Sequence, residues 1–222
     1  VIDHVIDRLK RSRLSDEIII ATTTLERDKV VVEQAKKNGV KWFCGSEDDV
    51  LSRYYCAAKE NDLDVVVRVT SDCPLIDPVI LDNVVDFYMS NNYTLVTNAG
   101  INFEQRTFPR GLDVEVFSFS MLEYAFNNAQ KSYQREHVTP YLYETYFDSI
   151  YYYKNDVDYS NFRWILDTDE DYALISAIYD RLYKKYGSNF GLYEVLELMK
   201  SNPELSMINA HVQQKSWFII NK

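Results

Sequence analysis

The sequence of 222 residues is short of glycine, proline and cysteine, and each shortage excludes a class of protein. Six glycines and five prolines are too few for a fibrous chain or an extended disordered one. The three cysteines form no C-x-x-C pair, and their odd number does not suit a disulfide framework. We therefore expect a globular protein whose thiols stay reduced, and we predict a cytoplasmic location.

The sequence also lacks a secretory signal, a long apolar run and a surplus of basic residues. No apolar run approaches the roughly 18 residues that a membrane-spanning helix needs. Basic residues number 24 against 34 acidic ones, which gives a formal net charge of −10. A field of that sign repels nucleic acid and anionic lipid, so we expect neither as a partner. A small anionic substrate would need a local basic patch or a divalent cation.

Aromatic residues, in contrast, are abundant, with 18 Tyr, 11 Phe and 3 Trp. One core of this size does not need so many, and the second half of the chain supplies a large share of them. Aromatic side chains are favoured anchors of protein interfaces. We therefore predict a homodimer that buries part of the region from Tyr141 to Tyr153.

Short apolar runs alternate with amphipathic segments in the first half of the chain, as is typical of βαβ units with a parallel sheet. Strands are predicted at 18–21, 40–44 and 65–69, and helices at 1–9, 25–38, 46–61 and 77–89. Ser46 is the expected N-cap of the third helix, with Asp49 at its capping-box position, and Asp77-Pro78 begins the fourth.

The second half is less regular and contains an irregular stretch at 98–111. Strands are predicted at 95–97, 114–119, 150–154 and 163–166, and helices at 121–129, 136–147, 169–186 and 192–200. We expect one α/β domain over residues 1–222, with three layers and an irregular insertion in its second half. Its sheet should be mostly parallel, with Val65–Val69 and Arg163–Leu166 in the interior.

Two aspartates follow predicted strands: Asp72 lies three residues past Val69, and Asp167 comes directly after Leu166. Ligands of open α/β sheets bind at the carboxyl ends of the strands. Two carboxylates that face each other there are typical ligands of a divalent cation that keeps positions open for phosphate oxygens. The alternative is that each aspartate caps a helix or a turn.

Four motifs occur in order along the chain, and together they are more specific than any one alone. They are Arg68-Val-Thr-Ser-Asp-Cys-Pro-Leu-Ile-Asp-Pro78, Phe108-Pro-Arg-Gly-Leu-Asp-Val-Glu-Val-Phe117, Arg135-Glu-His-Val-Thr-Pro140 and Leu166-Asp-Thr-Asp-Glu-Asp-Tyr172. With these motifs the sequence resembles the cytidylyltransferases that activate acidic sugars, in particular the branch named after spore coat polysaccharide biosynthesis protein F. The resemblance implies the Rossmann-like fold of nucleotide-diphospho-sugar transferases.

The resemblance also implies an activity: an enzyme that joins a sugar acid to CMP from CTP and releases pyrophosphate, for a surface or spore coat polysaccharide. It implies Mg²⁺ as the cofactor, with CTP and an acidic sugar as the substrates. Asp72 and Asp167 match the metal-ligand positions of the family, and we predict that both are catalytic. The family's Asp-Thr-Pro-Glu-Asp appears here as Asp167-Thr-Asp-Glu-Asp171, and a helix start tolerates the additional carboxylate of Asp169.

Four cationic residues of these motifs are candidates for substrate binding, and each has an alternative role. Arg68 can contact phosphate or pair with a carboxylate. Arg110 can bind a sugar carboxylate through two hydrogen bonds, or it can be an exposed loop cation. His137, expected at a helix start, can bind the sugar, act as a base or only pack. Arg135 can contact substrate or pair with its neighbour Glu136.

The sequence departs from the family in one segment. The nucleotide-binding segment of the family follows its first strand and reads roughly Arg-Met-Gly-Ser-Thr-Arg-Leu-Pro-Gly-Lys, and no such loop occurs here. We expect that this strand and loop belong upstream of the helix at Val1 and are missing from the chain. Two alternatives stay open: a glycosyltransferase of the related fold, although Ser71-Asp-Cys73 lacks the usual Asp-x-Asp, and a non-catalytic assembly subunit.

Overall fold

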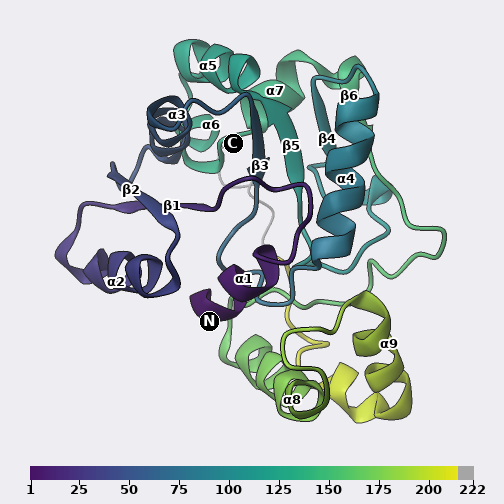
Figure 1. Ribbon diagram of the computed structural model, residues 1–222. Helices are drawn as coiled ribbons and strands as arrows, with labels where there is room; N and C mark the ends of the chain where they lie inside the picture. The colour runs from purple at the N-terminus through teal and green to yellow at the C-terminus, as the bar shows by residue number, and fades with distance from the viewer. Residues whose placement is uncertain (215–222) are drawn as a thin grey trace.

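The strands form two sheets in the computed structural model, which describes residues 1–214 (Figure 1). In the smaller sheet, β1 (Ile19–Thr23) and β2 (Lys41–Gly45) pair in parallel. The larger sheet has the order β3-β5-β4-β6, formed by Val65–Arg68 (β3), Glu115–Ser118 (β5), Leu95–Thr97 (β4) and Ile150–Tyr152 (β6). β5 runs antiparallel to both of its neighbours, whereas β4 and β6 are parallel. The predicted α/β architecture is confirmed, with β5 as the strand that reverses direction.

Two segments that we predicted for the interior of the sheet lie elsewhere. Within residues 1–214, β3 pairs only with β5 and therefore forms an edge of the larger sheet. The segment 163–166 is not a strand, because its sheet pairing is limited to one parallel bridge between Arg163 and Arg110. The nitrogen of Trp164 donates to the carbonyl of Arg110 (2.7 Å), and the Trp164 side chain is fully buried. The segment is thus interior, but it packs against the irregular insertion instead of joining the sheet.

Helices cover both faces of the larger sheet. The α-helices of the described residues are α1 (Ile2–Leu9), α2 (Lys29–Asn38), α3 (Val50–Glu60), α4 (Pro78–Ser90), α5 (Phe119–Asn128), α6 (Ser132–His137), α7 (Pro140–Thr145), α8 (Asp169–Tyr186) and α9 (Leu192–Ser201). Short 3₁₀ turns occur at Glu26–Asp28, Phe103–Gln105, Phe147–Ser149 and Pro203–Met207. Figure 1 shows α4 against one face of the larger sheet, with α8 and α9 beyond its lower end.

Two apolar clusters make the three layers, because successive side chains of a strand point to opposite faces. Val96 and Val116 pack into a cluster with buried residues of α4, α8 and α9. Their neighbours Leu95 and Phe117 pack into a second cluster with α3, α5 and α7. The predicted three-layer arrangement is therefore present, with the larger sheet between the two helical layers.

Side-chain caps fix where the main helices begin. Asp77 accepts hydrogen bonds from the nitrogens of Val79 (2.8 Å) and Ile80 (3.4 Å), as predicted for the start of α4. At α3 the cap differs from the prediction: Asp49 accepts from the nitrogen of Ser52 (2.9 Å) and is itself the N-cap. Ser46 instead binds the nitrogen of Asp49 (3.1 Å), one turn too early for the helix that forms.

The helix predicted at 136–147 is divided into α6 and α7. Val138 separates them with φ 73° and ψ −59°, a backbone conformation that a β-branched residue rarely adopts. His137 is consequently the last residue of α6, and the prediction that it lies at a helix start is wrong. No helix among residues 1–214 is both long and apolar enough to cross a bilayer.

A groove of about 690 Å³ separates β1 from β3, which do not pair with each other within residues 1–214. Both strand edges line it, with Ile19 and Ala21 on one side and Val65 and Val67 on the other. The groove thus lies between the two sheets.

Candidate active site

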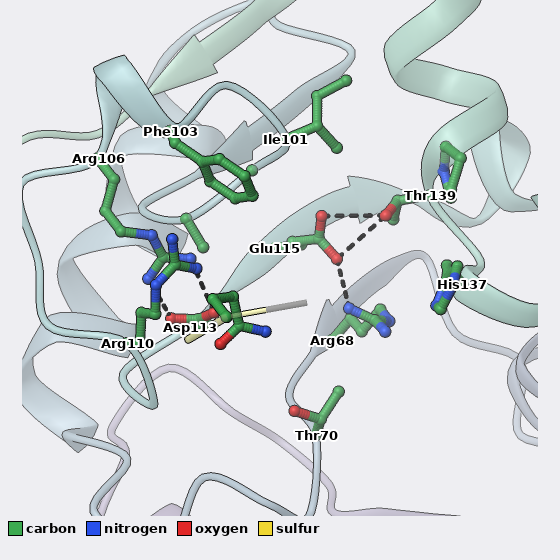
Figure 2. Close-up of a pocket in the computed structure, with 14 residues that line it drawn as sticks. Arg68, Thr70, Ile101, Phe103, Arg106, Arg110, Asp113, Glu115, His137 and Thr139 are labelled. Carbon is green, nitrogen blue, oxygen red and sulfur yellow. Dashed lines mark hydrogen bonds and ion pairs between the residues drawn. The ribbon is translucent and has the colours of Figure 1, made fainter. Parts of the chain in front are cut away.

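A cavity of about 200 Å³ opens where β3 ends and β5 begins. Figure 2 shows side chains from several parts of the chain that converge on it. Its polar and large apolar lining residues are Arg68 at the end of β3 and Thr70 beyond it, Ile101, Phe103, Arg106 and Arg110 from the irregular insertion, Asp113 before β5 and Glu115 in it, His137 and Thr139 at the α6–α7 junction, and Gln214. The insertion therefore forms one wall of the cavity and the α6–α7 junction forms another.

Three guanidinium groups face this cavity, and two of them are neutralised by carboxylates. Arg68 and Glu115 form an ion pair of 2.7 Å between directly opposed positions of β3 and β5. Arg106 binds Asp113 through two hydrogen bonds of 2.7 and 2.9 Å. Arg110 forms no ion pair with a carboxylate in the described part of the chain, and its guanidinium lies 4.7 Å from the ring centre of Phe103.

The cavity consequently has an uncompensated positive charge although the protein is acidic overall. Burial lowers the pKa of Arg110, the nearby charges of Arg106 and Arg163 act in the same direction, and the carboxylate of Asp113 opposes them. Arg110 still remains protonated at neutral pH, because an arginine side chain does not lose its proton in proteins. A half-buried cation with no ion pair of its own favours the binding of an anion.

Arg110 is held in place by the backbone around it. Its nitrogen donates to the carbonyl of Phe162 (3.0 Å), and its own carbonyl accepts from Trp164. Gly111 follows with φ +97°, and a Cβ there would collide with the backbone of Trp164. Only glycine allows this close approach, which fixes the loop that carries Arg110.

His137 is neutral in this environment. Burial lowers its pKa, the charge of Arg68 acts in the same direction, and Glu136 opposes both. A neutral imidazole can accept a proton through one of its nitrogens. The structure therefore brings together three of the predicted substrate residues: Arg68, Arg110 and His137.

Arg135, the fourth, does not line the cavity. Its guanidinium donates to Asp49 (3.0 Å) and to the carbonyl of Phe126 (2.7 Å), and it lies over the Phe126 ring. It also does not pair with Glu136, which we had offered as the alternative. Both results are geometric, since neither adjacent residues nor residues two positions apart face each other on a helix: Arg135 points away from Glu136, and also away from the cavity that His137 lines.

Asp72 and Asp167 are neighbours at the backbone level, because the nitrogen of Leu166 donates to the carbonyl of Asp72 (2.9 Å). The carboxylate of Asp72 accepts from Thr70, which lines the cavity. That of Asp167 is partly exposed and forms an ion pair with Arg163 (2.7 Å). No cluster of three or more potential metal ligands occurs among residues 1–214. Any cation here would thus have two protein carboxylates at most and need other ligands.

Sequence reasoning missed Arg106, Glu115 and Thr139 as lining residues. The sequence contained a signal for Glu115, because a carboxylate within an otherwise apolar strand needs a buried partner. Arg106 and Thr139 left none, since their positions depend on how the insertion and the α6–α7 junction fold.

Comparison with known proteins gives a consistent result. The model of the cytidylyltransferase family matches residues 1–199. An uncharacterized protein of Methanocaldococcus jannaschii, MJ1063, is 37% identical over 225 residues, which cover 98% of this chain and 86% of that protein. Spore coat polysaccharide biosynthesis protein SpsF of Bacillus subtilis is 26% identical over 210 residues, 92% of this chain and 85% of its own length.

Two solved structures are similar to the chain. A cytidylyltransferase from Leptospira borgpetersenii serovar Hardjo-bovis superimposes with a TM-score of 0.86 at 35% identity, over 96% of this chain and 87% of that one. A CMP:2-keto-3-deoxy-manno-octonic acid synthetase, solved in complex with CTP, has a TM-score of 0.51 at 14% identity, over 69% of this chain and 78% of its own. At that identity the second likeness supports the fold alone.

Proposed function

The chain belongs to the cytidylyltransferase family, a CTP-using class of nucleotidyltransferase, and from this premise we propose that it transfers CMP from CTP to a hydroxyl of an acidic sugar. The observation that supports an acidic substrate is the half-buried guanidinium of Arg110, which forms no ion pair among residues 1–214, because the nearby carboxylate of Asp113 is paired with Arg106. An arginine in such a place binds a carboxylate through two parallel hydrogen bonds. The relatives do not determine which sugar it is.

The remaining walls of the cavity suit one sugar ring. Thr70 and Thr139 offer hydroxyls for the polar groups of a sugar, and Ile101 and Phe103 offer apolar surface for its carbon skeleton. The volume of about 200 Å³ is below the range of roughly 300–1,000 Å³ that drug-sized ligands occupy. We therefore assign the cavity to the sugar and not to the nucleotide.

In the proposed reaction the sugar hydroxyl attacks the α-phosphorus of CTP in line. The new bond joins the sugar oxygen to phosphorus, the bond from the α-phosphorus to the bridging oxygen breaks, and pyrophosphate leaves. His137 is neutral and can accept the proton that the hydroxyl loses. Arg68 and Arg110 hold the sugar, so the contribution of the protein is mainly orientation.

Asp72 and Asp167 are the residues that would hold Mg²⁺. Mg²⁺ is usually bound by one or two carboxylates together with water and substrate phosphates. Asp72 and Asp167 fit that pattern, because the backbone of Leu166, next to Asp167, is hydrogen-bonded to the backbone of Asp72. When bound, the ion would neutralise the phosphate charge of CTP. Arg163 already forms an ion pair with Asp167 and orients that carboxylate.

We also propose that the groove between β1 and β3 receives a further strand, and that the loop after this strand binds the triphosphate. This follows the expectation that the family's first strand precedes α1. Support comes from the two facing strand edges and from their apolar lining, since a strand inserted there would pair on both sides.

The test is pyrophosphate release by the protein expressed from its complete gene. CTP, Mg²⁺ and a panel of sugar acids are compared with the same reaction containing neutral hexoses. We expect release only with CTP and with at least one sugar acid. Equal release of pyrophosphate with a neutral hexose, or no release with any sugar acid, would contradict the proposal.

A further inference from the structure

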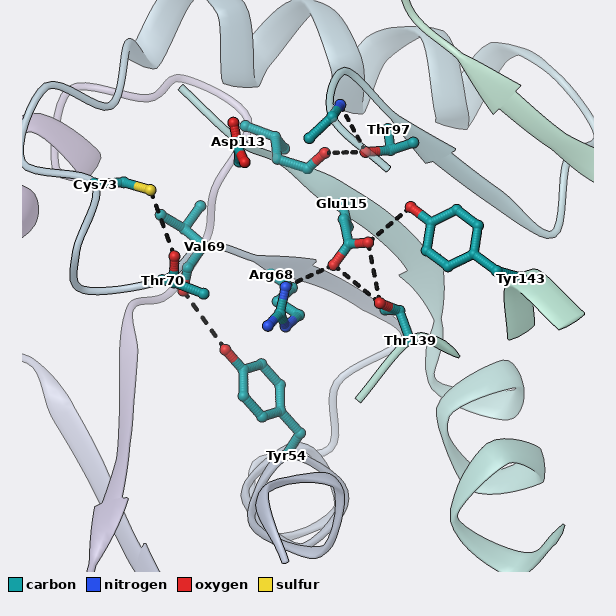
Figure 3. Close-up of polar contacts among 12 residues, drawn as sticks. Tyr54, Arg68, Val69, Thr70, Cys73, Thr97, Asp113, Glu115, Thr139 and Tyr143 are labelled. Carbon is teal, nitrogen blue, oxygen red and sulfur yellow. Dashed lines mark hydrogen bonds and ion pairs between the residues drawn. The ribbon is translucent and has the colours of Figure 1, made fainter. Parts of the chain in front are cut away.

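One buried carboxylate, that of Glu115, connects two parts of the candidate active site, β3 and the segment from the α6–α7 junction into α7 (Figure 3). Glu115 is 6% exposed and lies at the start of β5, the strand between β3 and β4. It accepts hydrogen bonds from Arg68 (2.7 Å), from the Thr139 hydroxyl (3.0 and 3.2 Å) and from the Tyr143 hydroxyl (2.7 Å). All three donors are thus oriented by a single side chain.

The first donor is a residue of the cavity itself. Burial opposes the charge of Arg68, but the carboxylate of Glu115 and the hydroxyl of Tyr54 outweigh it, so the pKa of Arg68 is raised. Only the Nη1 atom of Arg68 is used by Glu115. The Nε atom of the same guanidinium is buried and has no hydrogen-bond partner in the described residues. Arg68 is therefore held from one side and keeps donor capacity for a ligand.

The other two donors hold a strained turn. Val138 has φ 73° and ψ −59°, and the nitrogen of Thr139 donates to the carbonyl of His137 (2.9 Å). This is a γ-turn with positive central φ, which is rare and strained. Such a conformation persists only where the surroundings enforce it, and such conformations cluster at functional sites. Glu115 enforces it here, since it binds Thr139 at the exit of the turn and Tyr143 one helical turn later.

We propose that Glu115 is a positioning residue, whose buried carboxylate fixes Arg68 and the strained turn at Val138 so that Arg68 and His137 point into the cavity together. The inference rests on the proposed function, because that function supplies the substrate that Arg68 and His137 orient in the cavity. Glu115 acts through its neighbours and has no chemical role of its own in the transfer.

The first test is a double-mutant cycle on kcat/KM for the sugar acid, with Glu115→Gln, Arg68→Gln and the double variant. Glu115→Gln should lower kcat/KM by roughly 10- to 100-fold, the range expected when an orienting contact is lost. The loss should be smaller in the Arg68→Gln background, because residues that act as a unit are not additive. Asp77→Asn is the matched control, because it alters another buried, hydrogen-bonded carboxylate, which caps α4 away from the cavity. Its effect on kcat/KM should be additive with that of Arg68→Gln.

The second test needs no turnover and so separates this inference from the proposed function. In a crystal structure of Glu115→Gln we expect Val138 to leave the positive-φ region and the His137 ring to shift. Where Glu115→Gln does not fold, Tyr143→Phe serves, since it removes one donor and leaves Arg68 and Thr139 bound. Additive losses in the cycle, or an unchanged turn in the crystal structure, would overturn the inference. A wild-type protein without transferase activity would instead contradict the proposed function and leave the crystallographic result to decide.

Discussion

Replacing Arg8 by Met should destabilise the protein strongly, although Arg8 lies in α1 and does not line the candidate active site. Its side chain is fully buried and donates to four backbone carbonyls, those of Ile76 (2.6 Å), Phe190 (2.7 Å), Leu75 (3.2 Å) and Ser188 (3.3 Å). These carbonyls belong to the loop before α4 and the loop between α8 and α9. Arg8 therefore joins three segments of the chain that are far apart in sequence.

The magnitude follows from the acceptors that Met would leave without a donor. Three of the four hydrogen bonds are buried, and a buried acceptor without a partner costs about 1–3 kcal/mol. Burial of the charged guanidinium is itself unfavourable and lowers the pKa of Arg8. Met removes this buried charge, which offsets part of the cost. We expect the free energy of unfolding to fall by about 3–5 kcal/mol, similar to the loss of one partner from other buried charged contacts.

The assay is urea unfolding followed by circular dichroism, with Arg13→Met as the control. The control makes the same chemical change in a side chain that is 84% exposed and whose contact with Asp82 is 3.5 Å. Exposed ion pairs contribute about 0–1 kcal/mol, so the control should remain close to wild type. Equal unfolding free energies for the two variants would refute the argument that Arg8 is a structural connection.

Three further outcomes are expected. Sedimentation should show a dimer at tens of micromolar, an order of magnitude for ordinary interfaces. Phe147→Ser should weaken this dimer, because the Phe147 side chain is 70% exposed within the predicted contact region. A monomeric wild-type protein would contradict the prediction. Asp167→Asn should abolish Mg²⁺-dependent turnover, and calorimetry should detect no Mg²⁺ binding. The free energy of unfolding should fall by less than about 1 kcal/mol, since Asp167 is partly exposed. Full activity of the variant would exclude Asp167 as a ligand. The acid limb of the pH–rate profile should lie below pH ~6.5, because the pKa of His137 is lowered and its neutral form survives to lower pH; a His137→Gln variant with the same limb would refute this assignment.

Local signals in the sequence predicted much of the fold. Asp77-Pro78 begins α4 as predicted, because helix starts depend on side chains a few residues away, and the helix predicted at 169–186 forms with Thr168 and Asp171 as its capping box. The short apolar runs identified the strands of both sheets, because this pattern is also local in the sequence. Apolar composition alone, however, did not distinguish the buried segment at 163–166 from a strand.

What failed depended on contacts between distant residues. Asp77 also accepts from the nitrogen of Leu192 (2.8 Å), a contact across 115 residues that no local pattern encodes. Val138 interrupts a helical pattern because Glu115 holds the next residue from another layer of the fold. The same holds for the candidate site. Arg68, Arg110 and His137 were identified from motifs. The ion pair of Arg68 with Glu115 required the register of β3 with β5, and that of Arg106 with Asp113 required the fold of the insertion.

The measurement that tests the central claim most directly is the preference for a carboxylate, in wild type and in Arg110→Gln. We would determine kcat/KM for the best sugar acid of the panel and for its neutral carboxamide analogue. Hydrogen bonds to a charged group contribute about 1.5–3 kcal/mol, which corresponds to roughly 10- to 150-fold. The account predicts that wild type prefers the acid by about this factor, and that Arg110→Gln loses the preference while its activity on the carboxamide stays the same. A preference that persists in Arg110→Gln would contradict the assignment of this cavity to an acidic sugar.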